Sequence, residues 1–113
     1  IGTVSLLNMT QIGINPAEGK RIRLFKVTGN ADLASPAITD IIKIYKEAAG
    51  TYAQTLVTKS PVLTNQTDYN MTFTTNQPCG GIDFAVNERV IVNVNGDEYQ
   101  EAGAGVTVYY LEW

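Results

Sequence analysis

The sequence predicts an all-β domain, an antiparallel β-sandwich or jelly roll of about seven or eight strands. Short runs that alternate apolar and polar residues recur along the chain, with Gly, Pro and Asn between them. The polar content consists largely of Thr, which suits strands, and Asn, which suits turns. The pair Asn95-Gly96 separates two extended runs, which is the strongest short-range signal for a hairpin.

Residues 3–13 are expected to form the first strand, which ends at the turn residues Asn15-Pro16. This run contains Val, Leu and Ile but alternates only weakly. We therefore expect either an edge strand or an arm that pairs elsewhere.

Residues 20–28 are expected to form the next strand, with its end at Thr28–Asn30. The apolar alternation changes phase between Leu24 and Phe25. Because side chains alternate with a period of two, such a change indicates a β-bulge.

Residues 35–50 fit two interpretations. Ser35, Pro36 and Gly50 are suitable boundary residues for a helix, which would make the fold α+β with one helix near 36–49. The run 41–46 is also β-branched and aromatic, and a turn after it would lead into a second strand at 52–58. We favour the hairpin because the rest of the chain is β.

The remaining strands are expected in the second half of the chain. Residues 69–73 alternate most clearly, and Ile82, Phe84 and Val86 mark another run. Residues 90–113 predict a β-meander, in which 90–94 and 97–101 form a hairpin and 106–113 follows. With 113 residues and no long linker, residues 1–113 are expected to form a single β-sandwich domain.

The composition argues against an enzyme. Histidine is absent and Cys79 is the single cysteine, so the Ser–His and Cys–His nucleophile pairs cannot form within this chain. Zinc is not expected for the same reason. We interpret the acidic residues near the C-terminal turns as a solvated rim. We therefore expect no catalytic residues, no cofactor and no metal.

The charge pattern limits the classes of binding partner that are expected. The net charge is −3, so we expect no nucleic-acid binding. Arg21 and Arg23 alternate with apolar residues, which predicts a solvated strand face. No apolar run reaches the roughly 18–20 residues that a membrane helix needs, so no membrane insertion is expected.

Four aromatic residues are candidates for contacts with a partner or ligand: Tyr99, Tyr109, Tyr110 and Trp113. Tyr109 and Tyr110 are adjacent in one strand, so they point to opposite faces and one of them must lie outside or at an interface. Exposed Tyr and Trp serve both subunit interfaces and sugar stacking. Trp113 is expected to be docked in its own sheet or against a neighbour.

The overall pattern resembles small β-sandwich modules of virus particles, of the tailed-phage fibre, head-fibre and capsid-decoration type. The segments that carry the resemblance are Arg21–Val27, Ile41–Tyr45, Tyr52–Val57, Glu88–Gly96 and Val106–Trp113. The resemblance implies a non-enzymatic, oligomeric structural role on a virion or an extracellular or cell surface.

Three functions follow as hypotheses. The first is a structural or assembly module that self-associates, as a homo-oligomer or with other structural subunits, through sheet edges and tyrosine-rich contacts. The second is a carbohydrate-binding module, in which the tyrosines stack on glycan rings. The third is a filament subunit in which residues 1–13 complete the sheet of the next copy.

Overall fold

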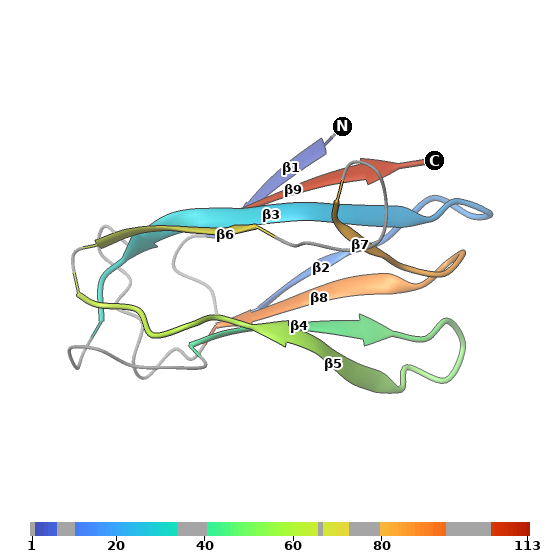
Figure 1. The fold of residues 1–113 in the computed structure, drawn as a ribbon. Coiled ribbons are helices and arrows are strands. Elements are labelled where there is room, and N and C mark those ends of the chain that lie inside the picture. Colours follow the sequence, from blue (N-terminus) through green and yellow to red (C-terminus); the bar gives the residue numbers. More distant parts are fainter. Residues whose placement is uncertain (1, 7–10, 34–40, 66, 73–79, 95–104) are drawn as a thin grey trace.

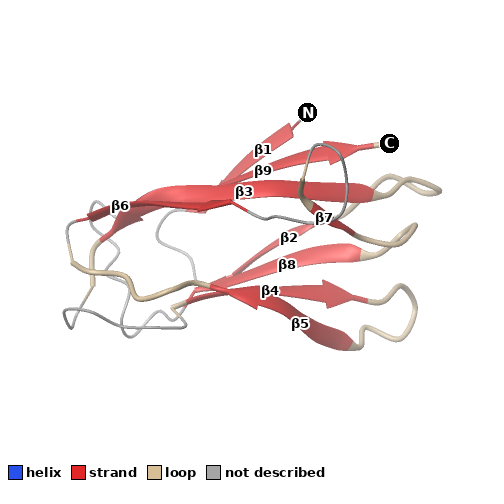
Figure 2. Cartoon of the chain, in the orientation of Figure 1, coloured by secondary structure: helices blue, strands red, loops and turns tan. Residues whose placement is uncertain are grey.

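Two antiparallel β-sheets pack face to face, which confirms the predicted all-β sandwich (Figures 1 and 2). The computed structural model describes residues 2–6, 11–33, 41–65, 67–72, 80–94 and 105–113. Within these residues there are nine strands and no helix. The strands are β1 (Gly2–Leu6), β2 (Gln11–Ile14), β3 (Ile22–Ala31), β4 (Ile42–Glu47), β5 (Gln54–Lys59), β6 (Thr67–Thr72), β7 (Ile82–Asp83), β8 (Arg89–Val94) and β9 (Gly105–Glu112).

The first sheet has the strand order β1-β9-β3-β6, and the second sheet has the order β2-β8-β4-β5. The short strand β7 also pairs with β3, at Arg23 and Leu24, while β6 pairs with β3 from Lys26 to Ala31. The strands β7 and β6 therefore follow one another along the same edge of β3.

The expected single strand at 3–13 is wrong, because two strands from this region enter different sheets. β1 pairs with β9 in the first sheet and β2 pairs with β8 in the second (Figure 1). Each is the outermost described strand of its sheet, as expected for an edge. Both strands pair within the chain here, and the use of residues 1–13 by another copy stays a prediction.

The bulge predicted in β3 is confirmed. The pairing of β3 with β9 shifts register between Leu24 and Lys26, which leaves Phe25 as the extra residue. The expected end of this strand at Thr28–Asn30 is wrong, since β3 continues to Ala31. Gly29 lies inside the strand because a Cβ there would collide with the Gly105 carbonyl oxygen and the Tyr69 ring.

The hairpin interpretation of the ambiguous segment is confirmed, and the helix near 36–49 is wrong where the structure describes it. β4 and β5 pair antiparallel, and Ile42 and Ile44 point into the core. The connecting turn is closed by hydrogen bonds from the Ala48 N–H to the Ala53 carbonyl and from the Tyr52 N–H to the Ala48 carbonyl. Residues 34–40 lie outside the described residues.

The predicted C-terminal meander is wrong, because β8 and β9 belong to different sheets. β8 is flanked by β2 and β4 from Val90 to Asn93, so its backbone has no edge left for the expected hairpin partner. The hairpin at Asn95-Gly96 and the run 97–101 lie outside the described residues. β9 does form, between β1 and β3.

Two other predicted strands are only partly as expected. In β6, Met71 is buried and Tyr69 packs against the core, which confirms the described part of the 69–73 alternation, while Phe73 lies outside the described residues. In the run 82–86 the strand is limited to Ile82–Asp83. Phe84 is fully buried, but Val86 lies in a turn and is 51% exposed.

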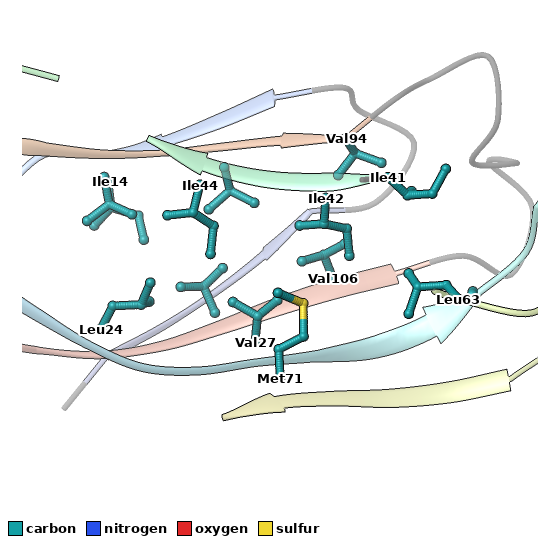
Figure 3. Close-up of a cluster of buried hydrophobic side chains, with 14 of the residues drawn as sticks. Ile14, Leu24, Val27, Ile41, Ile42, Ile44, Leu63, Met71, Val94 and Val106 are labelled. Atoms are coloured by element: carbon teal, nitrogen blue, oxygen red, sulfur yellow. The ribbon is translucent and has the colours of Figure 1, made fainter. Parts of the chain in front are cut away.

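The core lies between the two sheets and consists of aliphatic side chains, one methionine and Phe84. Figure 3 shows side chains from both sheets pointing toward each other. This core fixes which face of each strand is turned outward. Its buried members are Ile14, Ile22, Leu24, Val27, Ala31, Leu33, Ile41, Ile42, Ile44, Leu63, Met71, Phe84, Val90, Val92, Val94, Val106 and Val108.

Candidate functional site

The structure describes three of the four contact residues predicted from the sequence, and these three do not share one face of β9. Tyr99 lies outside the described residues. Tyr110 packs partly against the core, on the same side of β9 as the buried Val106 and Val108. Since side chains alternate along a strand, Tyr109 and Trp113 lie on the opposite, outer face of the first sheet.

Trp113 is held in place by its backbone and by two arginines. Its N–H donates to the Arg21 carbonyl at 3.0 Å, and its carbonyl accepts from the Arg21 N–H at 2.8 Å, which extends the β3–β9 ladder. The Arg21 and Arg23 guanidinium carbons lie 5.3 and 5.2 Å from the centre of the indole ring. Trp113 is nevertheless 43% exposed. Trp113 is thus docked in its own sheet while presenting an aromatic surface to solvent.

Both arginines are themselves anchored. Arg23 binds the Asp83 carboxylate through Nε and Nη2, at 2.5 and 3.1 Å, and Arg21 Nε donates to the Phe84 carbonyl at 3.1 Å. The hydrogen bond from Arg23 holds the pKa of the Asp83 carboxyl below its usual range, although desolvation opposes the shift. We call Arg21, Arg23, Asp83 and Trp113 the Trp113 cluster. Instead of the solvated face expected for the two arginines, the structure shows a fixed network.

The same outer face continues with a second cation and aromatic pair. Lys26 and Tyr109 are directly opposite each other on β3 and β9, and the Lys26 Nζ lies 4.5 Å from the centre of the Tyr109 ring. The bulge at Phe25 makes this possible. Because it adds one residue to β3, Lys26 lies on the same face as Arg23 despite the odd spacing between them.

A second exposed surface lies on the β4–β5 hairpin. Tyr52 in the turn is 69% exposed and Leu56 on β5 is 48% exposed. Leu56 pairs with Tyr45, which pairs with Ile91 on β8, which pairs with Gly13 on β2. These four residues form a row across the outer face of the second sheet, with Leu56 at its exposed end.

A polar network borders this row. The buried Glu47 carboxylate accepts from Arg89 Nη1 at 2.8 Å and from Gln54 Nε2 at 2.9 Å. A Cβ on Gly13 would lie 2.8 Å from the Arg89 Nη2 atom, so the guanidinium passes over the glycine. Glu47, Gln54 and Arg89, which border the row that contains Leu56, are therefore held in place by an ion pair and hydrogen bonds.

The sequence interpretation missed Tyr52, Leu56 and the part played by Arg21. It placed Tyr52 at the start of a strand, whereas the residue lies in the turn with a φ of 59°. The turn residue Gly50 was the only feature of the sequence that could have placed Tyr52 in the turn. Leu56 and Arg21 follow ordinary strand alternation, which reports the face of a residue but not its neighbours in adjacent strands.

Among the described residues, no three His, Cys, Asp or Glu side chains lie close enough together to hold a metal ion. In that same part of the chain, no helix has the length and apolar character needed to cross a membrane. Comparisons with models of known protein families, with curated proteins and with solved structures find no match.

Proposed function

We propose that this chain is a non-enzymatic structural module of a virion or extracellular surface that self-associates through the β4–β5 hairpin. The observation that carries the proposal is Tyr52, a bulky residue with a φ of 59° that is 69% exposed. Left-handed backbone costs a residue with a Cβ roughly 1–2 kcal/mol, and such outliers gather at sites of function. Tyr52 adopts this unfavourable backbone conformation and is exposed to solvent, so it is a suitable contact residue.

The edge of the second sheet supports the same proposal. β5 is the outermost described strand of that sheet, and Gln54–Thr58 contains no charged residue. Natural proteins usually protect such edges with charges or bulges. Here the register shift at Ile44 and Tyr45 leaves Val57 as an extra residue, and Lys59 follows. The part of the edge before the bulge, Gln54–Leu56, therefore remains suited to pairing.

A two-fold axis fits this edge. Two β5 strands that pair antiparallel across an axis normal to the sheet keep their outer faces on the same side. Because the pairing is confined to Gln54–Leu56, the axis passes beside Thr55, and Leu56 lies opposite Gln54 of the second copy. The two Leu56 side chains are then diagonal neighbours across the axis, and the turn that carries Tyr52 directly precedes the paired segment in each copy. Such an isologous arrangement is the commonest way in which identical chains form a closed dimer.

Substitution of Leu56 tests this proposal against a matched control. We expect Leu56→Lys to weaken dimerisation, measured by sedimentation velocity, because it places two like charges diagonally across the axis on the pairing edge. Val86→Lys is the control, since Val86 is 51% exposed but lies in the turn before β8. Equal weakening by both variants would contradict a contact at β5.

Carbohydrate binding is the second candidate, and one observation favours it. Trp113, which is 43% exposed, lies on the outer face of the first sheet, whereas the β4–β5 hairpin belongs to the second sheet. Aromatic rings bind sugars by stacking against their apolar C–H faces. This candidate uses different residues from self-association, so both functions can belong to one module.

A further inference from the structure

We infer that the Trp113 cluster binds an acidic saccharide, with one sugar ring stacked on the Trp113 indole and its carboxylate paired with Arg21. The inference deepens the carbohydrate-binding candidate by assigning the charge of the ligand. It does not depend on self-association, because no residue of the β4–β5 hairpin belongs to the cluster.

The charge distribution of the chain favours an anionic ligand at this place. The chain carries a net charge of −3, yet four of its eight cationic side chains lie between Lys20 and Lys26. The side chains of the cluster, two guanidinium groups and the Asp83 carboxylate, together carry one net positive charge. An acidic ligand would therefore be attracted to this face.

The hydrogen bonding identifies which arginine is available. Arg23 is committed to Asp83 through two hydrogen bonds. Arg21 uses only Nε, toward the Phe84 carbonyl, and among the described residues its Nη1 and Nη2 atoms have no hydrogen-bond partner. Two adjacent N–H groups of one guanidinium match the two oxygens of a carboxylate.

The aromatic part of the cluster favours a sugar ring over an acidic peptide. The site offers one indole ring and one available guanidinium edge, which match one ring and one carboxylate in the ligand. An acidic peptide would instead gain affinity from several cations or from a strand edge. β9 is flanked by β3 and, up to Tyr110, by β1, so most of its backbone is already paired.

Trp113 is the only tryptophan in the chain, so its fluorescence reports directly on the site. We expect tetragalacturonate to cause a saturable change in this fluorescence. The fully methyl-esterified tetrasaccharide has the same rings without the charge, and we expect it to bind at least about tenfold more weakly. This comparison uses the unmodified protein and so does not depend on the folding of a variant.

Two variants locate the contact. Arg21→Gln should weaken tetragalacturonate binding about tenfold, whereas Lys26→Gln, which removes the same charge from the same face beside Tyr109, should leave it unchanged. Equal losses in both variants would show general attraction of polyanions and overturn the assignment. Equal binding of the methyl ester, or tighter binding of an octaglutamate peptide, would also overturn it.

The association-deficient variant Leu56→Lys separates this proposal from self-association. It retains the Trp113 cluster, so we expect it to bind tetragalacturonate as the unmodified chain does. Loss of sugar binding in Leu56→Lys would contradict a site confined to the Trp113 cluster.

Discussion

Arg23 and Asp83 form a two-point ion pair that joins β3 to the two-residue strand β7. The Nε–Oδ1 distance is 2.5 Å and the Nη2–Oδ2 distance is 3.1 Å. Their side chains are 18% and 24% exposed, so water only partly screens the pair. Asp83 also accepts at its backbone carbonyl from Lys46 Nζ at 2.8 Å, which links β7 to β4 in the second sheet. The ion pair thus positions both Trp113 and a contact between the sheets.

Asp83→Asn should lower the free energy of unfolding by about 1 kcal/mol at pH 7, because it removes the charge from a partly screened pair. The folded pKa of Asp83 lies below the ordinary value of 3.8. Its contribution is therefore complete above that value and is lost as the pH falls through the folded pKa. Urea unfolding at several pH values checks this. A difference between the two proteins that stays constant down to pH 2 would contradict it.

Gly29→Ala should destabilise the fold by roughly 2–3 kcal/mol, because its Cβ would collide with the Gly105 carbonyl and the Tyr69 ring. Tyr69 also donates a hydrogen bond from its hydroxyl to that carbonyl, at 3.1 Å. Gly105→Ala is the matched control, since a Cβ there meets nothing within 4 Å. Urea midpoints should show a large loss for the first variant and little change or a slight gain for the second.

Tyr52→Asn should stabilise the isolated chain by roughly 0.5–1 kcal/mol, because asparagine tolerates a positive φ better than tyrosine does. The same variant should weaken self-association. Urea unfolding at low protein concentration measures the first effect, and sedimentation velocity measures the second. A variant that is more stable and associates as well as the original would remove Tyr52 from the proposed contact.

Arg89→Met should lower the free energy of unfolding by about 2–3 kcal/mol, because among the described residues it leaves the buried Glu47 carboxylate with the Gln54 amide as its side-chain partner. The double variant Arg89→Met with Glu47→Gln should recover part of this loss, since the uncompensated charge is then gone. Thermal or urea unfolding of the original chain, of Arg89→Met, of Glu47→Gln and of the double variant forms the required cycle. A double variant less stable than Arg89→Met would contradict this account.

The sequence predicted features that depend on local pattern. The phase change at Phe25 located the bulge, and the alternation around Ile44 and the turn after it located the β4–β5 hairpin. Each of these features can be predicted from a few consecutive residues, because the backbone of a strand fixes the period with which its side chains alternate.

Which strands pair with each other was not predictable from local pattern. The strands β8 and β9 look like successive strands of one meander, yet they pair in different sheets. The proximity of Asp83 to Arg23, sixty residues earlier in the chain, likewise depends on pairing between distant strands. A period of two reports which face of a strand is buried, but it does not report which strand lies beside it.

The most direct test of self-association is the absolute molar mass of the unmodified chain, measured by light scattering across a range of concentrations. We predict that the mass rises with concentration from 12.3 kDa toward twice that value. A mass of 12.3 kDa at every concentration would contradict an assembly of identical copies through the β4–β5 hairpin.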